Sequence, residues 1–182
     1  MIFQINNLHI TSSIYYELAE AHYAIKDITE KIHVNGNLVT DKYYAIICET
    51  CKGLLGITIE GFGSLTPSMC FKDHYLIIGC ALKLCFIDLE TKKQICEYDT
   101  DPFFQFVSSS NDSIIIVIHE IGVTAYNIRG SKLWDFESPD IIVAWKVLED
   151  GIFLTLLEGA ELTIDRQNGL LCAPPPKPFH LP

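Results

Sequence analysis

The sequence predicts a mainly β fold built from four antiparallel repeats, with one N-terminal helix. Short runs of β-branched residues recur along the chain, and turn residues bound each run. An aspartate precedes four of these runs, at Asp41, Asp73, Asp112 and Asp150, giving spacings of 32, 39 and 38 residues. A second apolar segment of strand character follows each run. Units of about 40 residues with three or four strands have the spacing of propeller blades, so we expect a small or partial β-propeller.

The N-terminal segment, residues 1–35, is expected to form a strand and then a helix. Residues 2–10 alternate between apolar and polar side chains, as a strand does. Apolar residues then recur at helical spacing from Ile14 to Ile32, with Ser12 or Ser13 available as an N-cap. This pattern predicts a helix over about 14–32, ended by Asn35 and Gly36.

Residues 36–172 are expected to hold the four β repeats, and with the N-terminal segment they form a single domain. The pattern predicts strands at 43–48, 54–60, 75–80, 83–89, 95–98, 114–119, 123–128, 132–136, 141–147, 152–157 and 160–165. The proline-rich residues 173–182 cannot pair in a sheet and are expected to form an extended tail.

One turn motif carries a resemblance to a known repeat. Residues 126–136 read YNIRGSKLWDF: an apolar strand ends in Asn127, turns through Gly130 and continues into a strand with Trp134. Residues 86–93 and 164–170 are similar but lack the tryptophan. Residues 36–172 thereby resemble the quinoprotein-type (PQQ-like) and WD-like β-propeller repeats. The resemblance implies a fold and no cofactor, because four units could not enclose the cofactor funnel of the quinoprotein enzymes.

Closure of the propeller depends on the last repeat, which has only residues 170–172 left for an outer strand. The N-terminal strand could complete this blade and join the two ends of the chain, which would remove two exposed sheet edges. Otherwise the sheets form an open or partial propeller.

Composition favours a cytoplasmic protein. No apolar run reaches the length of a membrane span, and the N-terminus lacks the basic and apolar regions of a secretory signal. The seven cysteines are odd in number and mostly lie within apolar strand patterns, which is typical of reduced thiols. Cys48 and Cys51 resemble half of a zinc site, which Cys80 and Cys85 could complete only if two turns converged. We expect these four to carry neither zinc nor disulfides.

Negative charge concentrates in the second half of the chain. Residues 1–87 carry 8 acids and 6 bases, a net charge of −2, whereas residues 88–182 carry 15 acids and 7 bases, a net charge of −8. Such a surface repels nucleic acid and anionic lipid and attracts a basic protein. The candidate partner-binding residues are the acids Asp135, Glu137, Asp140, Glu149, Glu158 and Glu161. A solvated acidic surface that only maintains solubility is the simpler alternative.

No motif predicts a catalytic site. The expected function is therefore a non-catalytic protein-binding module without a cofactor, for example an acidic immunity or antitoxin-type inhibitor of a basic toxin. The alternative is a small hydrolase-like enzyme or ligand-binding propeller that uses Asp73, His74, His119 and Glu120 at one end of the sheets. A pocket holding at least two of these four side chains within hydrogen-bonding reach would favour it.

Overall fold

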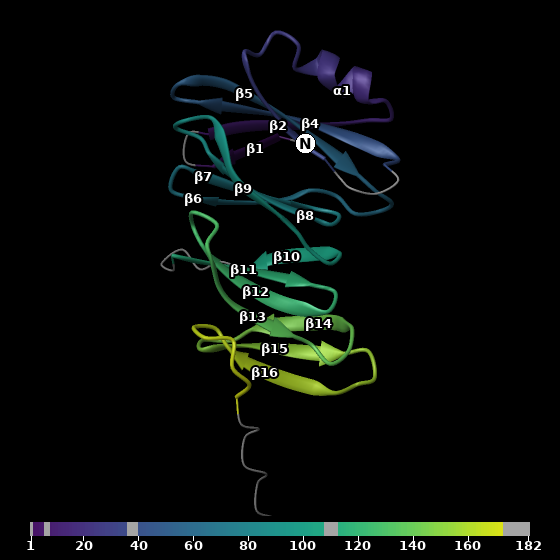
Figure 1. The fold of residues 1–182 in the computed structure, drawn as a ribbon, viewed down its shortest axis with the longest axis vertical. Helices are drawn as coiled ribbons and strands as arrows, with labels where there is room; N and C mark the ends of the chain where they lie inside the picture. The colour runs from purple at the N-terminus through teal and green to yellow at the C-terminus, as the bar shows by residue number, and fades with distance from the viewer. Residues whose placement is uncertain (1, 6–7, 36–39, 108–112, 173–182) are drawn as a thin grey trace, which may run out of the picture.

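A computed structural model describes residues 2–5, 8–35, 40–107 and 113–172, which form four sheets stacked along the long axis of the molecule (Figure 1). The sheets follow one another in chain order, so the N-terminal sheet lies at one end of the stack and the C-terminal sheet at the other. The tail over 173–182 and the motif residue Asp112 lie outside the described residues.

The first sheet has five strands in the order β1-β2-β4-β5-β3. Its elements are β1 (Ile2–Ile5), β2 (Leu8–Tyr15), β3 (Glu30–Val34), β4 (Lys42–Thr50) and β5 (Gly53–Gly61). All of its pairs are antiparallel except β3 with β5. The helix α1 (Leu18–Ala24) covers one face of this sheet, where Ala21, Ile25 and Ile28 pack on Ala45.

The remaining sheets are antiparallel with their strands in sequence order. The second sheet holds β6 (Ser68–Lys72), β7 (Tyr75–Cys80), β8 (Lys83–Asp88) and β9 (Lys93–Asp99). The third holds β10 (Phe103–Val107), β11 (Ile114–His119), β12 (Gly122–Asn127) and β13 (Lys132–Glu137). The fourth holds β14 (Ile142–Val147), β15 (Gly151–Leu156) and β16 (Glu161–Asp165). Each of the eleven strands predicted from the pattern has a counterpart here.

The predicted extent of the N-terminal helix is wrong, and of the two alternatives for closure the structure has the open one. The helix is 18–24 rather than 14–32, because residues before it pair with β4 and residues after it pair with β5. Ile14, expected on the helix, lies opposite Tyr44 in the sheet and is 53% exposed. The N-terminal strand also does not complete the last blade: it is a hairpin, β1 and β2, within the first sheet. The ends of the chain therefore do not join, and the stack is open (Figure 1).

Apolar side chains fill each space between neighbouring sheets. Ile46 and Ile57 of the first sheet share a cluster with Ile78 of the second. Phe86 of the second sheet shares another with Tyr126 of the third, and Val123 of the third shares a third cluster with Leu154 of the fourth. Successive side chains of a strand point to opposite faces of its sheet, and both faces of an inner strand are packed. The inner strands are therefore apolar at almost every position.

The motif that ends an inner strand in Asp or Asn has a common structural role. The side-chain oxygen of Asp88 accepts hydrogen bonds from the backbone N–H groups of Glu90 and Thr91. Asn127 and Asp165 do the same for the two equivalent turns. Such Asx turns stabilise the reversal of the chain and explain why the motif recurs in the second, third and fourth sheets.

Candidate functional site

Four connecting segments lie at one edge of the second, third and fourth sheets, and we call them the turn edge: residues 99–102, 119–122, 137–142 and 157–160. Strands that alternate in direction bring these turns to the same side. Backbone hydrogen bonds join them: Glu120 N–H donates to Pro102 at 3.0 Å, Ser138 N–H to Ile121 at 2.9 Å and Leu157 N–H to Ile141 at 2.8 Å.

Charge is segregated to the turn edge. Its segments contain six carboxylates and no Lys or Arg: Asp99, Asp101, Glu120, Glu137, Asp140 and Glu158. The equivalent turns at the opposite edge, 89–92, 127–131, 147–151 and 165–169, contain four carboxylates and three bases, Lys92, Arg129 and Arg166. These four turns of the turn edge thus have a formal charge of −6 against −1 for their counterparts. The β7–β8 turn, 80–83, lies at the same edge and adds Lys83, which pairs with Asp99 at 2.7 Å. With it, and with Lys72 and Asp73 of the β6–β7 turn at the opposite edge, the charges are −5 and −1, and the turn edge attracts cations more strongly.

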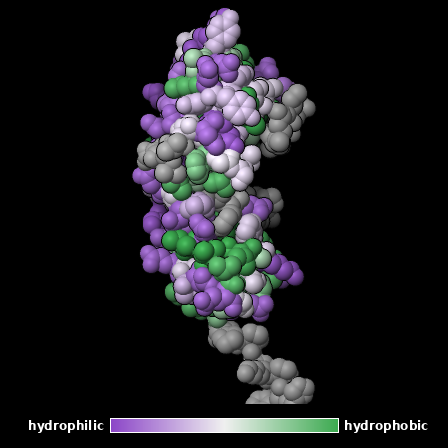
Figure 2. Space-filling model, turned by 90° about the vertical axis from the view of Figure 1, so that its right-hand side faces the viewer, coloured by the Kyte–Doolittle hydropathy of each residue, from purple (hydrophilic) through white to green (hydrophobic). Residues whose placement is uncertain are grey.

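Exposed apolar side chains lie among these carboxylates. Ile121 is 44% exposed and Leu157 is 61% exposed. Figure 2, which looks onto the side of the molecule that carries the turn edge, shows a hydrophobic band with hydrophilic side chains on both sides in the lower half of the stack. An apolar centre with a polar rim is the usual composition of a protein-binding surface.

The six predicted partner-binding acids occupy different places. Glu137, Asp140 and Glu158 belong to the turn edge, and Glu161 begins β16 beside it. Glu149 lies at the opposite edge, in the turn between β14 and β15. Asp140 also has a structural role, because its carboxylate accepts the backbone N–H groups of Ile141 at 2.7 Å and Glu158 at 2.9 Å.

A cavity of about 250 Å³ opens on the turn edge between the second and third sheets. The sequence pattern did not single out this site, since its residues come from four separate segments. It is lined by Asp99, Thr100, Asp101, His119, Ile121, Thr124, Tyr126, Lys132, Asp135, Glu137 and Ser138. Four carboxylates and one lysine line the cavity, and one of the four, Asp99, is also paired with Lys83 of β8 at 2.7 Å. The cavity is therefore anionic.

A chain of polar contacts runs along the cavity wall. Thr124 donates its hydroxyl proton to Asp135 at 2.6 Å, and Lys132 donates to the other oxygen of Asp135 at 2.9 Å. His119 Nε2 lies 3.2 Å from the Thr124 hydroxyl oxygen, and His119 Nδ1 lies 3.4 Å from Asp101. Burial opposes ionisation of Asp135, but the bonds from Thr124 and Lys132 outweigh it and lower its pKa.

The network determines the tautomer of His119. Asp135 is ionised and can only accept, so the single hydroxyl proton of Thr124 is committed to it. Thr124 can then only accept from His119, which places the imidazole proton on Nε2 and leaves Nδ1 as an acceptor. Nδ1 therefore faces the Asp101 carboxylate acceptor to acceptor, and it is buried without a hydrogen-bond partner in the described part of the chain.

The order Asp101, His119, Thr124 superficially matches the acid, base and nucleophile of a hydrolase. The tautomer argues against that role, because His119 Nε2 already carries a proton and cannot take one from Thr124. Burial also lowers the pKa of His119, although Asp101 and Asp135 oppose the shift, so the ring is neutral near pH 7.

The four residues of the alternative prediction are not brought together. Asp73 and His74 form the turn between β6 and β7, at the edge opposite His119. His74 stacks on Tyr75, with ring centroids 4.0 Å apart. Only His119 of the four lines the cavity. Adjacent strands alternate in direction, so turns separated by an odd number of strands lie at opposite edges, and this grouping was wrong.

The four cysteines considered for zinc differ in environment. Cys48, Cys80 and Cys85 are buried, whereas Cys51 is exposed in the turn between β4 and β5. Burial raises the pKa of each of the three buried thiols to about 12, so they are protonated rather than poised as ligands. Within the described residues, no group of three or more His, Cys, Asp or Glu could hold a metal ion.

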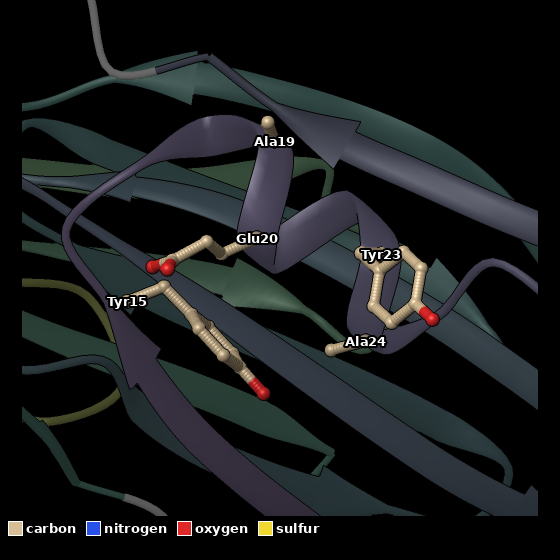
Figure 3. A pocket seen from close by; sticks show the side chains of 5 residues that line it. All are labelled: Tyr15, Ala19, Glu20, Tyr23 and Ala24. Carbon is tan, nitrogen blue, oxygen red and sulfur yellow. The ribbon is translucent and has the colours of Figure 1, made fainter.

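A second depression lies beside the helix, between α1 and the end of β2. Tyr15, Ala19, Glu20, Tyr23 and Ala24 line it (Figure 3). Figure 3 shows the Glu20 carboxylate beside the base of the Tyr15 side chain, whose ring extends away from it, with Tyr23 and Ala24 further along the helix. It is shallow and apolar, and Glu20 is the one charged residue in its lining. Its chemistry does not specify a ligand.

Comparison with known proteins supports the architecture alone. No protein-family model and no curated protein matches the chain. The computationally designed protein Ika4 superposes with a TM-score of 0.50 at 15% identity, over 63% of this chain and 75% of Ika4. The fold is propeller-like.

Two further matches are more distant. A europium-containing methanol dehydrogenase has a TM-score of 0.46 at 14% identity, over 61% of this chain and 25% of the enzyme. The N-terminal domain of Nup159 has a TM-score of 0.43 at 15% identity, over 63% of this chain and 32% of that domain. Within the described residues, no helix has both the length and the apolar character needed to cross a bilayer.

Proposed function

We propose that this chain is a non-catalytic protein-binding module whose turn edge binds a basic protein partner. In its specific form, the proposal is a cytoplasmic inhibitor of the immunity or antitoxin type, which covers the cationic active site of a toxin with carboxylates. The observation that carries it is the segregation of charge, −5 at the turn edge with Lys83 counted, against −1 at the opposite edge. Exposed Ile121 and Leu157 supply apolar contact area between the carboxylates.

The test compares two matched variants as baits in affinity capture from the native cell. The edge variant carries Glu137→Gln, Glu158→Gln and Glu161→Gln, and the control carries Glu149→Gln, Asp150→Asn and Glu90→Gln. Both variants lose three negative charges, so only the position of the change differs. We expect the edge variant to lose a basic partner that the control retains. Equal retention by both variants would contradict the proposal.

Salt provides a second test once the partner is identified. Ions at physiological strength screen charges beyond about 8 Å, so association with wild type should slow markedly as salt rises. The edge variant should show a shallower dependence. An association rate that is indifferent to salt would show that the acidic residues only solvate the surface.

The alternative function, a small hydrolase, draws support from the alignment of Asp101, His119 and Thr124. Turnover of a chromogenic ester by wild type and by Thr124→Val separates the two functions. We expect no turnover that depends on the Thr124 hydroxyl, because the tautomer of His119 prevents it from acting as a base toward Thr124. Loss of a measurable turnover in Thr124→Val would favour the hydrolase.

A further inference from the structure

We infer that the cavity beside His119 receives the guanidinium group of an arginine side chain from the basic partner. This inference rests on the proposed function and specifies how the turn edge recognises its partner. The starting point is that His119 Nδ1 lies 3.4 Å from the Asp101 carboxylate and is buried without a hydrogen-bond partner in the described part of the chain. With the imidazole proton on Nε2, as the contact with Thr124 favours, both atoms are acceptors. A donor that reaches both atoms would remove an unfavourable contact and satisfy a buried nitrogen.

The neighbouring groups also call for a donor. The hydroxyl oxygen of Thr100 lines the same cavity and is buried without a hydrogen-bond partner among the described residues. Glu137 adds a further carboxylate to the lining. Guanidinium presents five N–H donors in a plane and no acceptor, which suits a lining in which carboxylates outnumber cations. An ammonium group is a compact point charge with three donors and matches such a lining less well.

The size and walls of the cavity fit one side chain. Pockets for drug-sized ligands span about 300–1,000 Å³, and this cavity is smaller, at about 250 Å³. Ile121, which is 44% exposed in the lining, offers an apolar contact for the methylene groups.

An incoming cation can displace Lys132 from its ion pair with Asp135. The Lys132 bridge to Asp135 joins side chains that are 51% and 43% exposed, so it contributes little to stability. Lys132 is also the one cation in the cavity lining and repels an incoming guanidinium. Removing its charge should therefore strengthen binding, whereas a purely structural role would give no such gain.

His119 couples binding to pH. Protonation of His119 would place a proton on Nδ1, and the ring could then donate a hydrogen bond to Asp101. This bond would replace the one that the guanidinium group donates to Asp101. The charged groups around the ring are Asp101 and Glu137 from two turns, Asp135 and Lys132 from β13, and Asp99 at the end of β9 with its ion-pair partner, Lys83 of β8. Binding of the cation and protonation of His119 should exclude each other, so a saturating ligand should lower the apparent pKa of His119.

The probes are the methylamide of N-acetyl-arginine and its citrulline analogue, which has nearly the same shape without the charge. Binding to the full chain is followed by NMR through the ring protons of His119. We expect saturable binding of the arginine probe in the millimolar range, a lower apparent pKa of His119 at saturation, and weaker binding of the corresponding lysine probe. Absence of a saturable change at His119, or equal binding of the citrulline probe, would overturn the inference.

Single substitutions test whether the arginine probe binds in this cavity. Asp101→Asn and Glu137→Gln should each weaken the arginine probe about tenfold, the size expected when a charge-assisted hydrogen bond is removed. Lys132→Gln should strengthen it, and Glu149→Gln should leave it unchanged. Thermal unfolding of each variant shows whether the fold is intact. Equal weakening by Glu137→Gln and Glu149→Gln would reduce the effect to general electrostatics and overturn the inference.

The two proposals fail separately. If the edge variant loses a basic partner but the arginine probe does not bind, the turn edge is the partner surface and the cavity is not its pocket. If the probe binds but the edge variant keeps every partner that the control keeps, the proposed function is wrong and the cavity is a site for a free guanidinium compound.

Discussion

At the scale of single residues, two glycines with the same backbone conformation lie in different surroundings. Gly130 has φ +86° and Gly159 has φ +85°. A Cβ at Gly130 would overlap the sulfur of Cys96 and lie 3.1 Å from Phe86, whereas a Cβ at Gly159 would meet no atom within 4 Å. The pair therefore separates the cost of a left-handed backbone from the cost of overpacking.

We expect Gly159→Ala to lower the free energy of unfolding by about 1–2 kcal/mol, the cost of a left-handed conformation for a residue with a Cβ. Gly130→Ala should lower it by about 2–5 kcal/mol, because overpacking adds to the same backbone cost. Urea unfolding of both variants measures the difference. Equal losses would mean that the turn at Gly130 moves aside without cost.

His119 predicts a dependence of stability on pH. Burial lowers its pKa in the folded state below the ordinary value of 6.5, so the unfolded chain binds more protons in the window between the two values. The contribution of His119 to the free energy of unfolding is therefore complete above pH 6.5. It is lost as pH falls from 6.5 toward the pKa of His119 in the folded state. Wild type should lose more stability than His119→Gln between about pH 7.5 and pH 5. Chemical unfolding at the two pH values measures this, and identical losses would contradict it.

At the scale of elements, one carboxylate of the turn edge holds two turns together. Asp140 accepts backbone N–H groups from its own turn and from the turn between β15 and β16. Asp140→Ala should lower the free energy of unfolding by about 2–3 kcal/mol, since bonds to a charged group contribute about 1.5–3 kcal/mol each. Glu158→Gln should change it by no more than about 0.5 kcal/mol.

Thermal melting of these two variants distinguishes the roles. A melting temperature for Asp140→Ala equal to that of Glu158→Gln would show that the two hydrogen bonds are replaced by water without loss. For studies of partner binding, replacement of Asp140 should therefore disturb the fold as well as the surface.

At the scale of the whole molecule, the stack is held together by clusters that each belong to two sheets. Phe86 is fully buried, and its ring contacts Tyr98 of its own sheet and Tyr126 of the third sheet, with centroids 6.2 Å and 5.4 Å away. Each sheet alone is a thin layer with two apolar faces. The chain should therefore unfold cooperatively across neighbouring sheets rather than one sheet at a time.

Phe86→Ala tests this coupling. We expect a loss of about 3–5 kcal/mol in the free energy of unfolding, as for other buried phenylalanines. Hydrogen exchange should show reduced amide protection in β12 of the third sheet as well as in β8. Leu170→Ala, at a side chain that is 67% exposed, serves as the control with little effect. Protection lost in β8 alone would mean that the sheets unfold independently.

The sequence by itself determined the strands and their turns. Runs such as Ile114–Ile118 are too short and too β-branched for a helix, and Asp88, Asn127 and Asp165 mark where inner strands reverse. These are local signals, because periodicity and turn chemistry act over a few residues. The helix was predicted too long because the same apolar spacing from Ile14 to Ile32 serves partly as strand, and only pairing with β4 and β5 resolves it.

The tertiary structure determined the features that depend on residues far apart in the sequence. Whether the N-terminal strand joins the last blade or forms a hairpin in the first sheet depends on long-range pairing, and the stack is open as a result. The placement of the acids likewise followed from strand direction, which sends Glu137 and Glu158 to one edge and Glu149 to the other. The cavity at His119 gathers side chains from four segments. The tautomer that defines its chemistry is determined by contacts with Thr124 and Asp135, which no sequence spacing encodes.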